Sequence, residues 1–499
     1  MNSANGNIAD IIVVGGGGAG LAAAIEGATL GRSVILLEKN DHPGGTTAWS
    51  VGVLTATATP QQVKKGIKDS PTRHQAYMLK SKPTNEVKDN PALCRILTEN
   101  LADTVRWLTS LGVEFFGPIA EPPHKEQRLH LVVPNARAYI FHCTRRARRL
   151  GVDIRTGMRV IRLISDGGRV KGVVARSTAG GEIEFAARGG VVLASGDYAG
   201  SADLKKRFIS AQAASIQAIN PSSTGDGQLL GEELGGYILN GSVAMMKLRF
   251  VPPPRRKLIQ LIPPYHSVTR VMRWSLEHLP TSIIRPFMMG FLVTSLAPES
   301  TFLTGGGVLV NKMGSAVLYD GKDSIAAFVD QPEQRGFVLC DDVVARKFDQ
   351  WPHFISTAPG MAYTYFSDYR RSRPDLHHSH RDVKALALLA GMDPAALVKA
   401  LEIMAMARRE SDPAKGLQPP FHLLGPMQLY ITTTNGGLAI DEKFRILRRD
   451  GTPIAGLFGA GSAGQGGALL QGHGHHIGWA FTSGRLAGRN AAFEVVDEA

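Results

Sequence analysis

Residues 10–30 read DIIVVGGGGAGLAAAIEGATL, and this stretch decides the fold. An apolar strand at residues 10–14 runs into a glycine-rich turn, which leads into an alanine-rich helical segment. Gly15, Gly17 and Gly20 match the pattern G-x-G-x-x-G, whose glycines permit a tight turn, close approach of the backbone to a pyrophosphate and close packing of helix on strand. The positive N-terminal end of the helix then faces the phosphates. The stretch therefore predicts a Rossmann-like unit that binds a dinucleotide.

An acidic residue supports the same prediction. The next apolar strand, residues 33–37, ends at Glu38, which lies 18 residues after Gly20. An acid near this position typically bonds a ribose hydroxyl, and it disfavours a ribose that carries a 2′-phosphate. A glycine-rich loop without a ligand is the alternative. The strand before the turn, the helix after it and Glu38 together favour the nucleotide site.

The composition is that of a large globular protein. The 499 residues suffice for two to four domains, and a hydrophobic share of 43% with a charged share of 20% excludes a disordered chain. No apolar run reaches the roughly 20 residues that a membrane-spanning helix needs. Cys94, Cys143 and Cys340 lie far apart without a CxxC pair, so we expect neither disulfides nor a metal site. In the absence of a secretory signal, we expect a cytoplasmic protein.

Nearly half of the net charge of +13 lies in one segment. Residues 241–300 hold eight basic and two acidic residues and are interrupted by prolines. Within them an apolar helical stripe is predicted, flanked by Arg270, Arg273 and Trp274; its members are Val268, Val271, Met272, Leu276 and Leu279. Such a helix is typical of one lying in a membrane interface, which would place the protein peripherally at the inner face of the membrane. The alternative is a cap helix that packs over an apolar pocket.

A second basic run, residues 145–149, lies on a predicted helix. Nucleic-acid binding would explain it, but the sequence has no helix-turn-helix, zinc-finger or aromatic RNA-binding pattern. We therefore expect no nucleic-acid partner.

Further motifs are spread along almost the whole chain. They are the glycine fingerprint, GGTT at 44–47, GGVVLASGD at 189–197, TGDG at 224–227, GGVLVN at 306–311, NGG at 435–437, GLFGAG at 456–461 and LQGHGHHIG at 470–478. With these motifs in this order, the chain resembles the FAD-dependent fumarate reductase / 3-ketosteroid dehydrogenase flavoproteins, and more closely the ketosteroid dehydrogenase branch.

The resemblance implies an α/β fold with a Rossmann-like FAD-binding domain that is discontinuous in sequence. We expect this domain at residues 1–240 and 415–499, and an inserted α+β catalytic or cap domain at 241–414. Turn signals at 166–168 and 180–181 predict a β-rich extension of the FAD domain, and residues 382–406 are helical by periodicity. FAD is expected to bind non-covalently, at positions Gly15, Gly17, Gly18, Ala19, Gly20, Glu38, Lys39, Gly45, Thr46, Thr47, Val160, Ala194, Ser195, Gly196, Asp226, Gly461, His476 and Ile477.

The C-terminal block also bears on catalysis. In the ketosteroid enzymes, the glycine that matches Gly474 donates its amide to the substrate ketone, together with a tyrosine that is Leu470 here. The three substrate-binding or proton-donating residues of fumarate reductases align with Thr433, about Gln471 and Lys415–Leu417, and none is present. A dicarboxylate needs fixed positive partners, so a neutral or weakly polar substrate is favoured.

Candidates for the acid or base are histidines and tyrosines. His473 lies with His475 and His476 in the cofactor loop, where a histidine could move a proton, cap a helix or simply face solvent. Tyr363 and Tyr365 lie in the inserted domain, where the ketosteroid enzymes place a catalytic tyrosine, although such tyrosines are more often core residues.

The predicted function is desaturation of a hydrophobic cyclic ketone or 3-ketosteroid-like substrate, by removal of the α-proton and hydride transfer to the flavin. An ene-reductase acting on a non-dicarboxylate enone is one alternative, and a non-catalytic flavin-bound protein that binds membranes or lipids is another. Because no second strand–fingerprint–helix unit occurs, we expect no NAD(P)H domain and an external electron acceptor, either a quinone or a redox protein.

Overall fold

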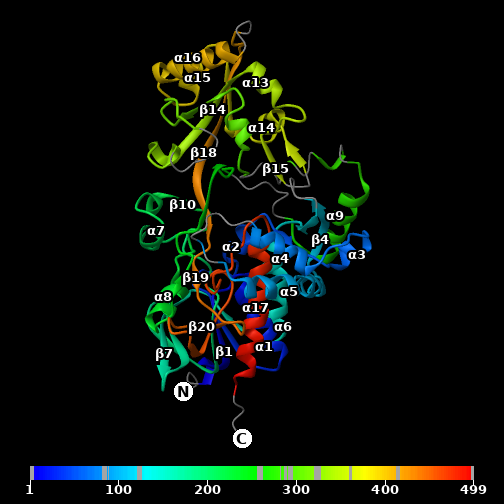
Figure 1. Cartoon of the computed structure of the whole chain (residues 1–499), viewed down its shortest axis with the longest axis vertical. Helices are drawn as coiled ribbons and strands as arrows, with labels where there is room; N and C mark the ends of the chain where they lie inside the picture. The colour runs from blue at the N-terminus through cyan, green and yellow to red at the C-terminus, as the bar shows by residue number, and fades with distance from the viewer. Residues whose placement is uncertain are drawn as a thin grey trace.

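Two β-sheets occupy opposite halves of an elongated molecule, and both chain ends lie at the end of the first sheet (Figure 1). The structure is a computed structural model. It describes residues 5–80, 87, 89–120, 126–254, 262–280, 283–285, 289, 296–319, 327–358, 362–411 and 416–495. Part of the expected basic segment lies outside the described residues, namely 255–261, 281–282, 286–288 and 290–295, as does Lys415.

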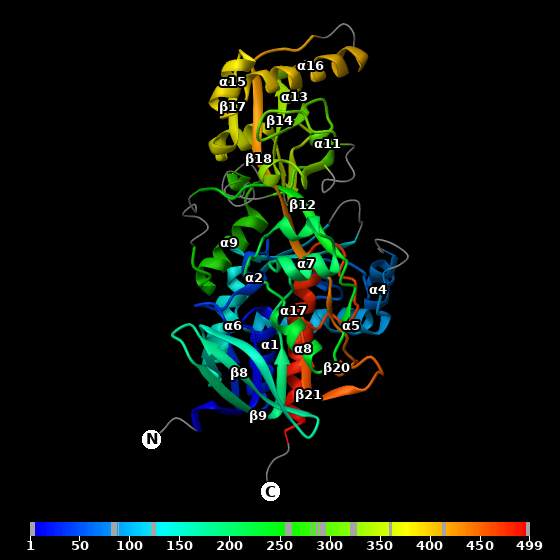
Figure 2. The ribbon, with the colours of Figure 1, turned by 90° about the vertical axis from the view of Figure 1, so that its left-hand side faces the viewer.

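The first sheet has eight strands in the order β20-β21-β8-β9-β1-β2-β6, with β7 paired to β8. Its strands are β1 (Ile8–Val14), β2 (Val34–Leu37), β6 (Asp153–Arg155), β7 (Met158–Asp166), β8 (Arg169–Ser177), β9 (Glu182–Leu193), β20 (Arg445–Leu447) and β21 (Pro453–Gly459). β1 runs parallel to β2 and β9, and β21 runs parallel to β9. Strands from both ends of the chain share one sheet, so the predicted discontinuous Rossmann-like fold is confirmed (Figure 2).

Two helices from the chain ends pack directly on each other. They are α1 (Gly18–Thr29) and α17 (His475–Phe493). A Cβ atom at Gly484 would lie 2.2 Å from the carbonyl oxygen of Ala19, and one at Gly488 would lie 2.2 Å from that of Ala23. Any larger side chain at these glycines would force the helices apart. Small residues thus bring the middle of α17 against the first turns of α1.

Other helices surround this pair and the first sheet. They are α2 (Gly45–Trp49), α4 (Pro71–Lys80), α5 (Pro91–Ser110), α6 (Arg137–Arg149) and α8 (Asp226–Glu233). A small sheet, β3 (Val53–Thr55), β5 (Gln127–Val133) and β4 (Glu114–Ala120), lies beside them. The expected β-rich extension is confirmed, because β7, β8 and β9 turn at glycines with positive φ, 57° at Gly167 and 97° at Gly180.

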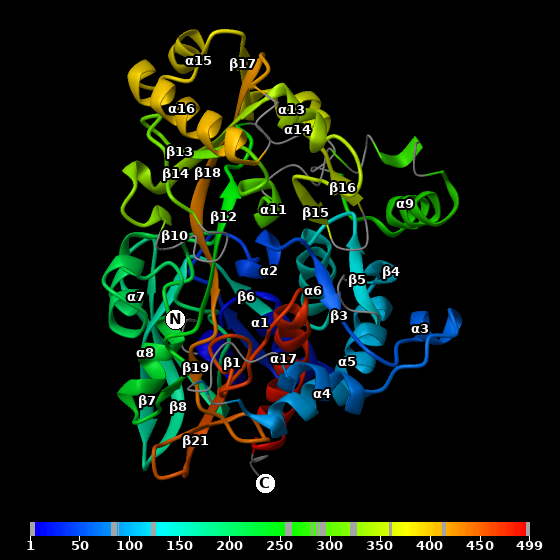
Figure 3. The ribbon, with the colours of Figure 1, turned by 45° about the horizontal axis from the view of Figure 1, so that its top comes forward.

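The second sheet is built around β18 (Phe421–Thr434), which pairs with four other strands. The sheet's remaining strands are β10 (Gln217–Ala218), β12 (Ala244–Phe250), β13 (Val308–Asn311), β14 (Arg335–Asp341) and β17 (His377–His380). We expected the return to the FAD domain at residue 415, but β18 still belongs to the second sheet. Its pairing with β12 carries the chain back toward the first sheet (Figure 3). The domain division stays a prediction.

The helical segment expected at 382–406 is two helices, α15 (Val383–Leu389) and α16 (Pro394–Ser411). Gly391 adopts a φ of 67°, and Pro394 can start a helix but cannot continue one. The periodicity of the flanking residues did not reveal this break.

Candidate functional site

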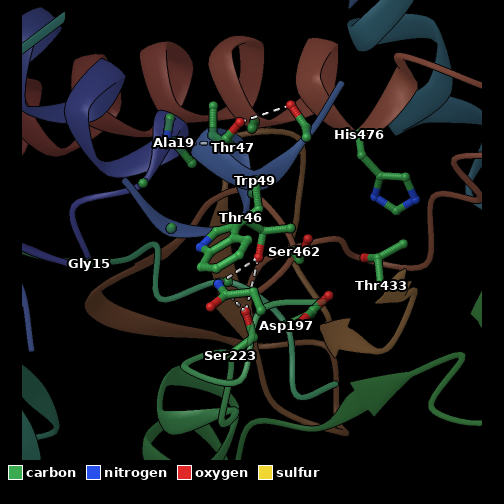
Figure 4. Close-up of a pocket in the computed structure, with 18 of the residues that line it drawn as sticks. Gly15, Ala19, Thr46, Thr47, Trp49, Asp197, Ser223, Thr433, Ser462 and His476 are labelled. Atoms are coloured by element: carbon green, nitrogen blue, oxygen red, sulfur yellow. Dashed lines mark hydrogen bonds between the residues drawn. The ribbon is translucent and has the colours of Figure 1, made fainter. Parts of the chain in front are cut away.

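One large pocket lies between the glycine turn after β1, the start of α17 and the lower ends of β12 and β18; we call it the main pocket. Figure 4 shows Gly15 at one end of it and the side chains of His476 and Thr433 at the other. Every predicted cofactor residue except Gly20 lines it. Gly20 instead packs on the turn, where a Cβ atom would lie 1.8 Å from the carbonyl oxygen of Gly15.

The glycine turn leaves room for a ligand on one side only. Gly15 has a φ of 105°, and a Cβ atom there would lie 2.6 Å from the carbonyl oxygen of Ala194. At Gly17, which precedes the first turn of α1, no heavy atom would come closer than 3.9 Å. The turn is therefore tightly packed at Gly15 and open at Gly17. This arrangement fits a pyrophosphate against the N-terminus of α1.

Glu38 is held at the pocket wall by backbone and side-chain donors. Its Oε2 accepts a hydrogen bond from the backbone amide of Gly16 at 2.7 Å. Its Oε1 accepts from the backbone amide and the side-chain amide of Asn40, at 2.8 and 2.7 Å. The side chain is almost fully buried but lines the pocket. A carboxylate oriented in this way fits the ribose hydroxyls of a dinucleotide.

An ion cluster centred on the nearly buried Asp226 connects the end of β2 to α8. Asp226 lies 2.9 Å from Lys39 and 2.9 Å from Arg159. Burial acts to raise the pKa of Asp226, but the charge of Lys39 and hydrogen bonds from Lys39 and Arg159 outweigh it and lower that pKa. Asp226 is thus ionised, and the cluster stiffens one wall of the pocket.

A second polar network closes α2 over the pocket. Asn220 donates to Thr46 Oγ1 at 3.0 Å and to Ser223 Oγ at 3.1 Å. The hydroxyl oxygens of Thr46 and Ser223 lie 3.0 Å apart (Figure 4). Thr47 accepts a hydrogen bond from the amide of Gly18 at 3.2 Å. Sequence reasoning missed Asn220 and Ser223, which precede the TGDG motif.

His476 is the polar side chain whose surroundings point most directly to a ligand. Within the described part of the chain, neither ring nitrogen has a hydrogen-bond partner, although both are buried. Burial, and secondarily the charge of His475, lower the pKa of His476 to about 4, so the ring is neutral at neutral pH. A buried imidazole facing a pocket without a protein partner fits a bound group with hydrogen-bonding atoms. With the open face at Gly17 and the oriented Glu38, the pocket fits FAD.

The predicted catalytic residues divide into two groups. Gly474 and His473 line the main pocket. Tyr363 and Tyr365 do not: Tyr363 packs on Phe354 with ring centroids 4.6 Å apart, and Tyr365 lies under Arg285 at 5.1 Å. Their aromatic rings are used for packing around the β15 (Ser356–Ala358) and β16 (Ala362–Thr364) hairpin, and a catalytic role for them stays a prediction.

The upper end of the pocket contains residues that the sequence did not single out as ligands. They are Met245 and Arg249 of β12 and Thr432 and Thr433 of β18. Met245 is the register partner of Thr433, so pairing of the two strands brings segments almost 190 positions apart to one wall. Burial lowers the pKa of Arg249. The alternation of Met245, Lys247 and Arg249 was the available signal, but it does not reveal the partner strand.

Comparison with known proteins identifies the family. The family described as FAD binding domain matches residues 10–258 and 272–472. The chain belongs to this family. It is an FAD-dependent oxidoreductase of the group that includes fumarate reductases and ketosteroid dehydrogenases, so the predicted fold, enzyme class and cofactor are confirmed. The placement nearer the ketosteroid branch stays a prediction.

Curated relatives of this FAD-binding family cover nearly the whole chain. A fumarate reductase (cytochrome) of Shewanella frigidimarina is 26% identical over 99% of this chain and 78% of its own length. A vinyl phenol reductase of Lactiplantibacillus plantarum is 24% identical over 97% of this chain and 96% of its own length.

Two solved structures share the fold. The open conformation of a flavocytochrome c3 fumarate reductase superposes with a TM-score of 0.76, at 23% identity, over 98% of this chain and 79% of that one. A 3-ketosteroid Δ1-dehydrogenase of Sterolibacterium denitrificans superposes with a TM-score of 0.66, at 17% identity, over 98% of this chain and 100% of that one.

Proposed function

We propose that this enzyme reduces a carbon–carbon double bond conjugated to a carbonyl or a single carboxylate. Arg249 carries the proposal, because it adds a fixed positive charge to the upper end of a pocket whose lower end fits FAD. The two curated relatives described above are both reductases by name, which supports the reductive direction. The sequence favoured a neutral or weakly polar substrate, whereas the proposed substrate has one anionic or strongly polar end.

The chain's own residues would divide the work along the pocket. When bound and reduced by the external donor, FAD would supply a hydride to one carbon of the double bond. Arg249 would hold the carbonyl or carboxylate oxygen of the substrate and stabilise the negative charge that develops there. Met245 and the methyl groups of Thr432 and Thr433 would exclude water from the reacting carbons.

A proton must reach the neighbouring carbon to complete the reduction, and we assign this step to His473. It lines the pocket mouth and is exposed, so it can take a proton from solvent. Burial raises the pKa of Glu299, and the charges of Lys247 and His473 partly offset this rise. The charges of Glu299 and His473 therefore interact with each other. The positive N-terminal end of α17 would favour negative charge on the reduced cofactor.

Electrons would enter from outside the chain. A quinone or a separate redox protein is the proposed donor, as the absence of a second nucleotide fingerprint in the sequence suggests. The name of the Shewanella relative contains the word cytochrome, which is consistent with a redox protein as the source of electrons.

Replacement of Arg249 tests the assignment of the substrate end. With reduced methyl viologen as the electron donor, Arg249→Met is expected to raise KM for crotonate or cinnamate at least tenfold, while the FAD content stays that of the wild type. Arg249→Lys, which keeps the charge, should recover part of the loss. An unchanged KM in Arg249→Met would refute the assignment.

Desaturation of a hydrophobic cyclic ketone is the second candidate. The apolar side chains of Val51, Val53 and Met245 in the pocket lining favour it. In that reaction His473 would remove the α-proton rather than donate one. Bleaching of the oxidised flavin by a saturated cyclic ketone or a 3-ketosteroid, without reoxidation of the reduced flavin by enones, would select this candidate.

A further inference from the structure

A basic and aromatic surface lies where α6 meets α9 (His266–His278), on the same side of the molecule in Figures 1 and 2. The residues just before α9 contact α6: the rings of Phe141 and Tyr265 have centroids 5.7 Å apart, and Nε2 of His142 lies 2.9 Å from the carbonyl oxygen of Pro264. We call it the α6–α9 surface. Its members are Arg145, Arg148, Arg149, Tyr265, Arg270, Val271 and Trp274.

The α6 part of this surface contains a shallow hollow suited to an anion. Its apolar floor is Ile140 and Phe141, and its other lining residues are Thr144, Arg145, Arg148 and Arg149. All three arginines are exposed, and none has a carboxylate within 4.0 Å among the described residues. The hydroxyl oxygen of Thr144 is buried and has no hydrogen-bond partner in the same part of the chain. The three guanidinium groups beside this hollow provide donors of the kind that a phosphate requires.

The α9 part is anchored on one face, and its exposed face carries Val271 and Trp274 among polar residues. Arg273 lies 2.8 Å from Glu114 of β4, and His266 lies 3.4 Å from the same carboxylate. The anchored face leaves Val271 65% exposed and Trp274 54% exposed. The apolar stripe expected from the sequence is thus divided, because its other members are half-buried while Val271 faces solvent.

We propose that the α6–α9 surface attaches the enzyme to an anionic lipid membrane, with a lipid phosphate in the α6 hollow. Tryptophan and tyrosine prefer the interface between lipid headgroups and hydrocarbon, and each nearby arginine adds attraction to anionic lipid. A nucleic acid would use the arginines but would leave Val271 without an apolar partner. The exposed aliphatic side chain beside Trp274 therefore favours a lipid surface. The attachment does not depend on which reaction the main pocket performs.

Flotation of the FAD-loaded enzyme with liposomes tests the proposal. We expect binding to vesicles of phosphatidylcholine with 30% phosphatidylglycerol, weak binding to pure phosphatidylcholine, and a decrease at 0.5 M NaCl. In the triple variant Arg145→Glu, Arg148→Glu, Arg149→Glu, the partition coefficient should fall at least about a hundredfold, since each basic residue near the surface contributes roughly fivefold. Trp274→Ala should remove most of the binding that persists at 0.5 M NaCl.

A matched triple variant on α15 and α16, Lys384→Glu, Lys399→Glu, Arg409→Glu, makes the same change in net charge at the far end of the molecule and should bind as the wild type does. Flavin absorbance confirms that each variant is folded. Equal binding to neutral and anionic vesicles, or equal losses in the two triple variants, would overturn the proposal. The proposal would also be overturned if duplex DNA or RNA competes with vesicles for the enzyme and Trp274→Ala binds vesicles as the wild type does. If inorganic phosphate binds in the α6 hollow and the enzyme binds no vesicles, the hollow is a site for free phosphate and the proposed membrane attachment is wrong.

Discussion

The carboxylate of Glu38 accepts a hydrogen bond from the backbone amide of Gly16 at 2.7 Å, which ties the end of β2 to the glycine turn after β1. The same carboxylate accepts two hydrogen bonds from Asn40. One side chain thus fixes the geometry of the turn and presents an acceptor to the main pocket. Folding of the local structure and recognition of the nucleotide depend on the same residue.

Substitution of Glu38 should weaken FAD binding. Glu38→Ala removes a carboxylate acceptor and leaves the amides of Gly16 and Asn40 without it, and hydrogen bonds to charged groups contribute about 1.5–3 kcal/mol. We expect the Kd of FAD for the apoprotein to rise roughly 10- to 100-fold, as measured by quenching of FAD fluorescence. Glu182→Ala, at an exposed position of β9, serves as the control. An unchanged Kd in Glu38→Ala would separate this residue from the cofactor.

Two glycines of the fingerprint should respond differently to alanine. A Cβ atom at Gly17 would meet no heavy atom within 3.9 Å, so Gly17→Ala should change the free energy of unfolding of the apoprotein by less than about 0.5 kcal/mol while weakening FAD binding. At Gly20 the Cβ atom would lie 1.8 Å from the carbonyl oxygen of Gly15. Gly20→Ala should therefore destabilise the apoprotein by at least about 2 kcal/mol.

Urea denaturation of the two apoproteins and titration with FAD check this contrast. The account fails if Gly17→Ala loses stability as Gly20→Ala does, or if it binds FAD with wild-type affinity.

His476 should lower the stability of the apoprotein and strengthen the binding of FAD. Its buried ring lacks a protein partner within the described residues, so His476→Leu is expected to leave the free energy of unfolding of the apoprotein unchanged or raise it by about 1 kcal/mol. The same variant should bind FAD less tightly and shift the absorbance bands of the bound flavin. Loss of apoprotein stability together with an unchanged flavin spectrum would mean that the ring serves packing alone.

His130 should make the stability of the protein depend on pH. Burial lowers the pKa of this fully buried histidine to about 4, whereas the unfolded chain takes up the proton near pH 6.5. Between these values the unfolded state binds more protons, so stability falls as the pH decreases from about 6.5 to about 4. The loss from this one residue is about 3 kcal/mol.

In His130→Gln this contribution disappears, and the free energy of unfolding should decline less steeply over the same range of pH. Urea titrations of wild type and variant at half-unit intervals measure the difference. Parallel curves for the two proteins would contradict the assignment.

The sequence was most informative where structure is local. The strand, turn and helix at residues 10–30 are contiguous in sequence, and Glu38 comes at the end of the next strand. Their positions around the pocket therefore follow from the geometry of a strand–turn–helix–strand unit. The family motifs extended this reading to Thr46, Asp226 and His476, which the fold brings to the same pocket.

Residues that depend on long-range pairing could not be found in this way. Arg249 and Thr433 reach one pocket because β12 pairs with β18, and neither strand contains a signal for the other. The tyrosine-rich segment shows the opposite case. Tyr363 packs on Trp351 and Phe354, which lie close to it in sequence, so local packing accounts for the pattern, and a catalytic role for Tyr363 stays a prediction. The apolar periodicity at 382–406 continues past Gly391, where the backbone breaks the predicted helix into two.

Anaerobic stopped-flow measurement of flavin reoxidation tests the central claim most directly. The bound FAD is reduced chemically with one equivalent of dithionite and mixed with α,β-unsaturated acids and enones. We predict that at least one of them restores the oxidised flavin spectrum, with the saturated product formed in equal amount, and that Arg249→Met slows this step when an acid is used. If no activated double bond reoxidises the flavin, while saturated ketones bleach the oxidised enzyme, the enzyme is a desaturase and the proposed reduction is wrong.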